Sequence, residues 1–435
     1  MITCVIDRKI KRPVYIQIYD QLKNAIESGE LAANAKLPSK RSFAEQNGVS
    51  VITVENAYGQ LLAEGYIRSE VKKGYFVEKV EKRNFSSKSM VEAEHPLEEA
   101  VPKPSNINFP FATWARILRD ELSNDQDRLL TKPPFEGVYK LRLAISNYLR
   151  EYRNITAYPE QIIIGAGTEY LYMLIRVLFN RDYVFGLEDP GYSRIADIYS
   201  QYHIRCEHIP VLEDGIDMDY LRSKEIDVVH ISPSHHFPTG VVTSIGKRYE
   251  LLKWAAEDKE RFIIEDDYDS EFRLAGKPVP SLYSIDNSGK VIYMNTFSKS
   301  LASTIRISYM VLPASFLNMV RDKMELFTCP VSTFEQYTLA RFISEGHFEK
   351  YINRMRRSYK KKKDELMERM HEYSIFNDCI VSGENSGLHC VVKFNTELSD
   401  DELLDEMRKL DIESRKISDY YFEKPKDTHV LILYY

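Results

Sequence analysis

The chain has 435 residues, which corresponds to two or three domains at about 150 residues per domain. Hydrophobic residues make up 43% and charged residues 29% of it, so the composition is that of a globular protein with material for a large core. The net charge of −6 excludes a uniformly basic nucleic-acid coat, and five scattered cysteines without a Cys-x-x-Cys pair exclude a disulfide scaffold or a thiolate zinc finger.

The N-terminus lacks the apolar core of a signal peptide, and the cysteine usage fits a reducing compartment, so we predict a cytoplasmic protein. No apolar run approaches the ~18 residues that span a bilayer, so no membrane partner is expected. The charge is uneven: residues 8–79 carry 12 Lys and Arg against 8 Asp and Glu, whereas residues 80–435 carry a net −9. A small basic region on a large acidic body predicts that only the first region meets a polyanion.

The first predicted domain spans residues 10–79 and begins with three helices. An apolar stripe predicts the first helix over residues 14–28. Ser39 and Ser50 stand where N-caps would start two further helices, over 40–47 and 51–64. Because an Asn-Gly turn dipeptide separates these two short helices, they are typical of a helix-turn-helix.

The segment after these helices predicts a β-hairpin wing, with strands over residues 66–68 and 74–77. We expect residues 51–58 to enter a major groove of DNA, while basic and hydroxyl side chains hold phosphates. The candidate DNA-binding residues are Ser39, Lys40, Arg41, Ser50, Thr53, Lys72 and Lys73. On periodicity alone, a small helical domain with an ordinary solvated charged face explains the same pattern.

The stretch LPSKRSFAEQNGVSVITVENAYGQLLAEGYI resembles the GntR-type winged-helix signature, and the likeness covers most of residues 10–79. This resemblance implies that the first domain binds promoter DNA. Val51 stands at a position that is commonly Arg in the family. We therefore expect one phosphate or base contact of the family to be missing, which affects the operator sequence and not the DNA-binding role.

Residues 80–105 are charged, contain Ser and Pro and have few large apolar residues, so we predict a linker. Over residues 106–435, short apolar runs that end in Gly, Pro, Asp or Ser alternate with helical patterns. This alternation predicts an α/β body with a mostly parallel sheet and a small C-terminal lobe. Ligands of such sheets bind at the carboxyl ends of the strands, so the polar residues that end these runs are the candidates for chemistry.

Four segments end such runs: GAGTEYL at 165–171, EDPGYSR at 188–194, FIIEDDYDSEF at 262–272 and VIYMNTFSKSLASTIR at 291–306. The first leaves backbone N–H groups free at a helix start, where a phosphate can bind, although a plain helix cap is the alternative. The second is equally compatible with a surface turn, and the third with a solvated acidic loop. In the fourth, Lys299 lies between two serines with Arg306 seven residues on, which favours an imine-forming lysine beside a phosphate site.

His235 and His236 lie in sequence before the acidic segment and raise the question of a zinc site. Adjacent residues point in different directions, however, and no His-Glu-x-x-His helix follows. We therefore predict no metal site.

In this order, the four segments resemble the site of fold-type-I aminotransferases, which bind pyridoxal 5′-phosphate (PLP). The resemblance implies a Schiff base on Lys299, the carboxylate of Asp266 beside the pyridine nitrogen, and the hydroxyl of Tyr268 on the phenolic oxygen. By its family position, Tyr192 would stack on the ring. The residues that would hold the phosphate are Gly167, Thr168, Ser298 and Arg306.

Together, the two halves resemble the MocR family of bacterial regulators, also called GabR-like, which join a GntR-type winged helix to an aminotransferase-like domain. PSHHFPTG at 233–240 resembles a stretch of that family, with His236 in place of Gln. The resemblance implies a head-to-tail homodimer that binds promoter DNA and senses a small amine, an amino acid or PLP itself. RNA polymerase is a further candidate partner.

Some residues depart from catalytic aminotransferases. Phe237 replaces the Asn that usually precedes Pro-Thr-Gly, and Asp419 takes the place of a second carboxylate-binding arginine. Arg194 and Arg415 remain as candidate effector contacts, and because the family usually continues past LILYY we expect a short C-terminal lobe. We therefore expect a regulator whose body acts as a sensor. An active aminotransferase with a DNA-binding appendage, or a body that has lost PLP and only dimerises, are the alternatives.

Overall fold

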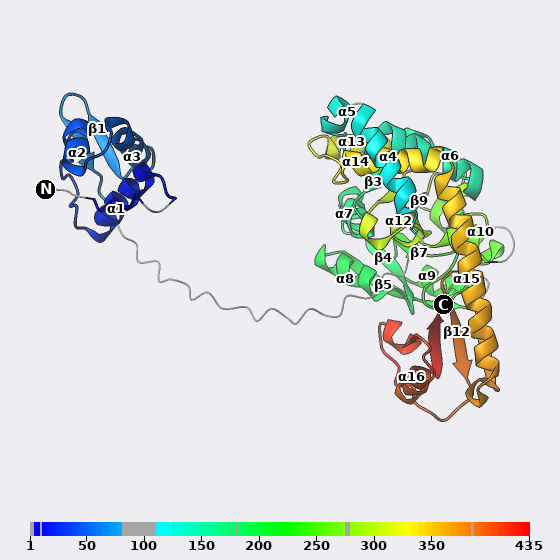
Figure 1. The fold of residues 1–435 in the computed structure, drawn as a ribbon. Coiled ribbons are helices and arrows are strands. Elements are labelled where there is room, and N and C mark those ends of the chain that lie inside the picture. Colours follow the sequence, from blue (N-terminus) through cyan, green and yellow to red (C-terminus); the bar gives the residue numbers. More distant parts are fainter. Residues whose placement is uncertain are drawn as a thin grey trace. The chain divides into compact units, whose positions relative to one another are not determined.

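The computed structural model describes residues 4–8, 11–80, 109–124, 126–179, 181–274, 279–383 and 387–435. The chain divides into two compact units, Met1–Pro102 and Lys103–Tyr435 (Figure 1). The boundary between the units lies in residues 81–108, outside the described residues. The linker over 80–105, and the domain limits that depend on it, therefore stay predictions.

The first unit has the helices and hairpin that the sequence predicts. Its elements are α1 (Val14–Ser28), α2 (Lys40–Asn47), α3 (Val51–Ala63), β1 (Ile67–Glu70) and β2 (Gly74–Val77). Ser39 and Ser50 cap α2 and α3, and each hydroxyl accepts a hydrogen bond from the backbone N–H three residues on, at 3.2 and 3.1 Å. The three helices close on a core that includes Ile18, Phe43 and Tyr58. This unit is a winged helix, with the paired strands β1 and β2 as its wing.

The second unit is built on an eight-stranded sheet with the order β3-β10-β9-β8-β7-β4-β5-β6. Its strands are β3 (Ile162–Gly165), β4 (Val184–Asp189), β5 (Arg205–Leu212), β6 (Gly215–Ile216), β7 (Val228–Ile231), β8 (Phe262–Asp266), β9 (Val291–Thr296) and β10 (Ser308–Val311). The neighbours β9, β8, β7, β4 and β5 are parallel. β10 runs antiparallel between β3 and β9, and β6 is a short antiparallel edge. The predicted mostly parallel sheet is therefore confirmed.

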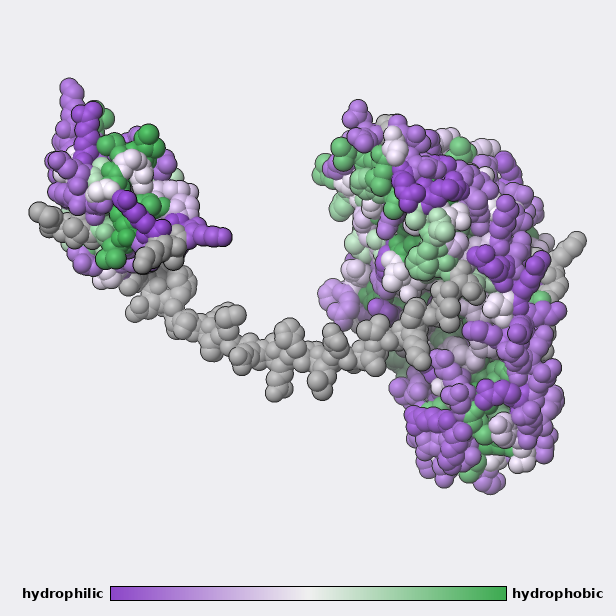
Figure 2. Space-filling model, in the orientation of Figure 1, coloured by the Kyte–Doolittle hydropathy of each residue, from purple (hydrophilic) through white to green (hydrophobic). Residues whose placement is uncertain are grey.

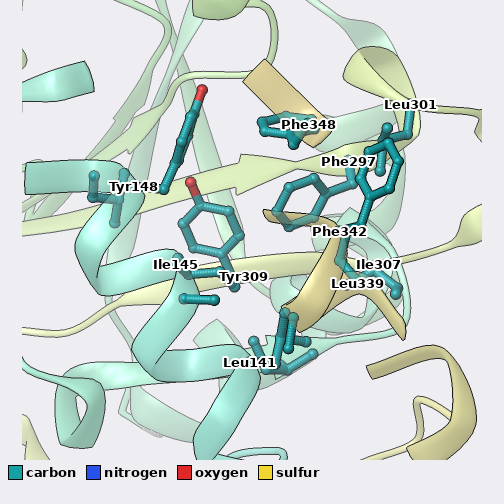
Figure 3. Packing of buried hydrophobic residues seen from close by; sticks show 14 of the residues in the cluster. Leu141, Ile145, Tyr148, Phe297, Leu301, Ile307, Tyr309, Leu339, Phe342 and Phe348 are labelled. Atoms are coloured by element: carbon teal, nitrogen blue, oxygen red, sulfur yellow. The ribbon is translucent and has the colours of Figure 1, made fainter. Parts of the chain in front are cut away.

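Helices cover both faces of this sheet. They are α4 (Phe111–Asn124), α5 (Gln126–Leu130), α6 (Tyr139–Arg153), α7 (Thr168–Leu178), α8 (Ser193–Gln201), α9 (Met218–Ser223), α10 (Ile245–Ala256), α11 (Leu282–Ile285), α12 (Phe297–Ser300), α13 (Leu317–Met324), α14 (Thr333–Ser344) and α15 (His347–His371). Because side chains alternate along a strand, Ile162 and Ile164 join the core under α6 and α14, whereas Ile163 joins the core under α7 and α13. Figure 3 shows the first of these cores, where Leu141 and Ile145 of α6 lie beside Tyr309 of β10.

A smaller antiparallel sheet forms the C-terminal lobe, with the order β11-β12-β14-β13. Its elements are β11 (Cys379–Ser382), β12 (His389–Phe394), α16 (Asp400–Lys409), β13 (Ser414–Lys416) and β14 (Val430–Tyr434). The long helix α15 connects the two cores, because Phe348 and Met355 pack in the main core while Leu366 and Met370 pack in the lobe. Among the described residues, no helix is long and apolar enough to cross a membrane.

Candidate functional site

The four predicted segments meet at one edge of the large sheet. The strand register places Gly165 beside Ser308 and Ser308 beside Thr296, and it pairs Asp266 with Met294 of the neighbouring strand. The carboxyl ends of β3, β9 and β8 therefore lie next to one another, where the loops that follow them carry the candidate residues. This is the edge at which open α/β sheets bind their ligands.

The turn between β3 and α7 forms a cradle for an anion. Gly167 has a φ of 91°, and an added Cβ atom would lie 2.1 Å from a guanidinium nitrogen of Arg306. The guanidinium therefore lies directly over the start of α7, where Thr168 begins the helix and backbone N–H groups favour anions. Ser298 follows β9, which ends at this edge of the sheet. Its buried hydroxyl oxygen has no hydrogen-bond partner among the described residues.

A carboxylate of the chain itself already contacts this cradle. Glu169 accepts a hydrogen bond from Arg306 at 2.5 Å through one oxygen, and its other oxygen lies 3.5 Å from Arg194. Burial disfavours the charge of Glu169, but its own backbone N–H and the Arg306 guanidinium outweigh burial and lower its pKa. Arg194, predicted as an effector contact, is therefore linked to the predicted phosphate site through Glu169.

Asp266 offers a buried acceptor that nothing in the described chain uses. One of its oxygens accepts a hydrogen bond from the Tyr172 hydroxyl at 3.4 Å and lies 3.7 Å from Nε2 of His230. Nδ1 of His230 lies 2.8 Å from the hydroxyl of Tyr199, so this contact holds the ring with Nε2 facing Asp266. The other oxygen of Asp266 is buried without a partner, as expected of a carboxylate that meets a protonated ring nitrogen.

Tyr268 is oriented by a histidine. Nδ1 of His235 lies 2.8 Å from a carboxylate oxygen of Asp269 and 3.3 Å from the hydroxyl of Tyr268. Since the carboxylate can only accept, Nδ1 donates, and the hydroxyl proton of Tyr268 is left for another acceptor. Burial raises the pKa of Tyr268, and Asp269 and Asp266 raise it further. The phenol therefore stays protonated as a donor.

Lys299 belongs to the short helix α12 and is exposed at this edge. Burial lowers the pKa of His389 to about 3, and the charges of His235 and Lys299 add to this effect. The ammonium of Lys299 is thus within electrostatic reach of His389, which comes from β12 of the C-terminal lobe. The rings of His389 and His235 are 5.0 Å apart, so the lobe forms one wall of the site.

Aromatic side chains form the outer part of the site. Tyr192 is 46% exposed, and its ring contacts Phe237 edge-on at 6.1 Å. Phe237 in turn contacts Tyr420 at 4.9 Å, and Arg415 donates a hydrogen bond to the Tyr420 hydroxyl at 3.4 Å. Arg415 is therefore connected to the site through this aromatic chain, whereas Asp419 lies 3.9 Å from the ammonium of Lys424.

Two further buried groups at this edge are neutral near pH 7. Burial raises the pKa of Glu188 to about 8. The backbone N–H of Ser232, which donates a hydrogen bond to Glu188 at 2.9 Å, lowers this pKa but does not outweigh burial. Burial lowers the pKa of His236 to about 3, and Nε2 of His236 lies 3.6 Å from Glu188. Glu188 and His236 therefore form an uncharged pair in this part of the site. The negative charge of Asp266 raises the pKa of Glu188 further.

The predicted DNA-binding residues lie on the surface of the first unit. Lys40 is paired with Glu55 at 2.5 Å, and Lys73 with Glu70 at 3.1 Å. Arg41 and Lys72 are exposed, and Lys72 is at the tip of the wing. Besides capping α3, the Ser50 hydroxyl shares a hydrogen bond of 2.8 Å with the Thr53 hydroxyl.

Several residues that lie at these two surfaces were not among the candidates from the sequence. Within the segment 51–58 that is expected to enter the groove, Ile52 is 69% exposed and Asn56 is exposed in the next turn, and Asn is a residue type that recognises adenine edges. In the body, the candidates did not include the residues that hold Asp266 and Tyr268, namely Tyr172, His230 and His235. No group of three His, Cys, Asp or Glu residues within the described ranges could hold a metal ion.

Comparisons with known proteins agree with this architecture. The family described as "Aminotransferase class I and II" matches residues 102–418, and "Bacterial regulatory proteins, gntR family" matches residues 14–77. The uncharacterized HTH-type transcriptional regulator YdeL of Bacillus subtilis is 36% identical over 434 residues, which cover 98% of this chain and 93% of that protein.

The probable rhizopine catabolism regulatory protein MocR of Rhizobium meliloti is 31% identical, covering 99% of this chain and 92% of that protein. Among solved structures, the kynurenine aminotransferase of Pyrococcus horikoshii matches 76% of this chain and 83% of its own, with a TM-score of 0.66 at 24% identity, which shows the fold. The chain is therefore a member of the MocR family, bacterial transcription regulators in which a GntR-type winged helix is joined to a class I/II aminotransferase domain.

Proposed function

We propose that this regulator holds PLP in its aminotransferase domain, with Lys299 as the amine that forms the Schiff base, and that occupancy of this site controls binding to promoter DNA. The observation that carries the proposal is the set of unused buried groups around Lys299. One oxygen of Asp266 and the hydroxyl of Ser298 have no partner among the described residues. The guanidinium of Arg306 lies over the start of α7.

These residues fit the chemistry of PLP. The cofactor would supply an aldehyde for an amine and a ring that acts as an electron sink. Gly167, Thr168, Ser298 and Arg306 would bind its phosphate, and Asp266 would keep its ring nitrogen protonated. Tyr268 would donate its free hydroxyl proton to the ring oxygen, and Tyr192 would lie over the ring.

The ligand that switches the regulator would be a small amine, an amino acid or PLP itself. Arg194 and Arg415 are the candidate contacts for a carboxylate, and Arg415 is linked to Phe237 through Tyr420. Such a ligand changes DNA binding only if its affinity differs between two states of the body. The head-to-tail homodimer and a contact with RNA polymerase belong to this proposal.

The test is a visible absorption spectrum of the purified protein with PLP, before and after borohydride reduction, beside Lys299→Ala and the exposed control Lys253→Ala. We expect a borohydride-sensitive band in the wild type and in Lys253→Ala, and none in Lys299→Ala. A band that persists in Lys299→Ala would contradict the assignment of the lysine. Amino donors that turn over to keto acids would instead support an aminotransferase.

A further inference from the structure

The most basic part of the chain lies outside the winged helix. Residues 350–363 contain eight Lys and Arg and no Asp or Glu, although the chain as a whole carries a net charge of −6. This run belongs to α15, a helix of 25 residues in the body. A run of like charges is usually only a solvated surface, so its arrangement on the helix decides what it can bind.

One face of α15 holds the helix on the body. Tyr351, Met355 and Tyr359 are buried in the main core. Arg356 also faces inward, because its Nε donates to the backbone carbonyl of Glu271 at 2.5 Å. The opposite face is therefore fixed in position by packing, and Figure 2 shows hydrophilic residues along the flank that α15 forms in Figure 1.

Four exposed basic residues line this outer face, which we call the basic stripe: Lys350, Arg354, Arg357 and Lys361. Their spacing of three or four residues places them within one narrow arc of the helix, over a length of about 16 Å at 1.5 Å per residue. Lys360 and Lys362 are exposed beside them. A row of this length and shape matches phosphates that follow one another along a DNA strand.

The ion pair that Lys361 makes within the chain is weak. Lys361 is 79% exposed and lies 3.5 Å from Glu365, one turn away, a pair type that contributes only ~0.3–0.5 kcal/mol. The guanidinium of Arg354 lies 5.5 Å from the centre of the Tyr351 ring. The pair with Glu365 leaves the ammonium of Lys361 largely in solvent, so Lys361 can exchange this contact for a phosphate oxygen.

We propose that the basic stripe of α15 is a second DNA-binding surface, which contacts the phosphate backbone of the duplex held by the winged helix. Double-stranded DNA is the partner that we expect for a transcription regulator. A row of cations on a rigid helix can contact the phosphates of its backbone without recognising its sequence. The inference rests on DNA binding by this regulator and does not depend on PLP.

The experiment compares the full chain without PLP with the variant Lys350→Gln/Arg354→Gln/Arg357→Gln/Lys361→Gln on a random-sequence duplex several helical turns long, across a salt series. Each phosphate contact makes affinity fall about 3.5-fold for a fourfold rise in salt. If three contacts are lost, the affinity of the variant should fall roughly 40-fold less over that range than the affinity of the wild type. At low salt, the variant should bind more weakly.

The matched control removes two Arg and two Lys from exposed positions elsewhere on the body: Arg222→Gln, Lys224→Gln, Lys259→Gln and Arg408→Gln. We expect this control to keep the wild-type salt dependence, and a stripe in which Lys and Arg are exchanged for one another to keep it as well. If the stripe variant and the control change by the same amount, or neither changes, the proposal is wrong. Loss of binding in the charge-keeping exchange would also contradict it.

Discussion

Two of the residues that would meet the cofactor, Asp266 and Ser298, have buried polar atoms with unused hydrogen-bonding capacity. A buried polar atom without a partner is costly, and the free oxygen of Asp266 and the hydroxyl of Ser298 are two such atoms at one edge of the sheet. Tyr172 and His230 both face the same oxygen of Asp266, so the other oxygen is left without a hydrogen-bond partner among the described residues. We infer that these residues are arranged for a bound group.

Glu188 predicts a pH dependence of stability. Its pKa in the fold is about 8 because of burial, while an ordinary glutamate titrates near 4.5. Between these values the folded state holds a proton that the unfolded state has lost, so the contribution of Glu188 to the free energy of unfolding falls by about 1.4 kcal/mol per pH unit as the pH rises. The contribution is fully present below the lower value and lost above the upper one.

Glu188→Gln keeps an acceptor for the Ser232 N–H and removes this titration. We expect the difference in unfolding free energy between variant and wild type to grow in favour of the variant from about pH 5 to 8, measured by urea unfolding of the body. The exposed Glu160→Gln should show a constant difference. A constant difference for Glu188→Gln as well would mean that Glu188 is ionised in the fold.

At the scale of elements, the turn between β3 and α7 is the predicted phosphate site. Gly167 adopts a φ of 91° with the Arg306 guanidinium directly above it. A side chain at this position would both strain the backbone and displace the arginine. The turn therefore needs glycine for two independent reasons.

We expect Gly167→Ala to weaken PLP binding by about 10-fold or more, since the added Cβ would displace the Arg306 guanidinium and a hydrogen bond to a charged group contributes about 1.5–3 kcal/mol. The measurement is the Kd for PLP, titrated by absorbance at fixed salt. The matched control is Gly246→Ala in α10, where an added Cβ meets nothing within 4 Å. Wild-type affinity in Gly167→Ala would show that the phosphate does not bind at this turn.

Caps, turns and apolar periodicity are local signals, and they predict the helices and hairpin of the first unit and the mostly parallel sheet of the second. The resemblance to the GntR signature is what identifies the first unit as a winged helix. The sequence also predicts the four segments of the candidate site, because strand ends of a parallel sheet share one edge. It does not predict that His235 orients Tyr268, 33 residues away in sequence, or that Tyr172 contacts Asp266, 94 residues away. Such contacts depend on how the elements pack.

At the scale of the whole molecule, the winged helix and the candidate ligand-binding residues lie on separate units of the regulator. Within the body, α15 contacts both the main core and the C-terminal lobe, and the lobe contributes His389 to the site. The main part of the body and the lobe approach each other closely at two glycines, where a Cβ on Gly240 would be 3.0 Å from the Cα of Gly383. A ligand that shifts the lobe relative to the main core would therefore also shift α15, which packs against both.

The most direct test of this account measures the affinity of the full chain for an operator selected from random-sequence DNA, with and without PLP, in the wild type and in Lys299→Ala. Linked sites typically change each other's affinity by about 5–150-fold. We expect a change in this range for the wild type and none for Lys299→Ala, which should keep the basal affinity of the protein without PLP. If PLP leaves the wild type unchanged, or changes both proteins equally, the aminotransferase domain does not control DNA binding through this site.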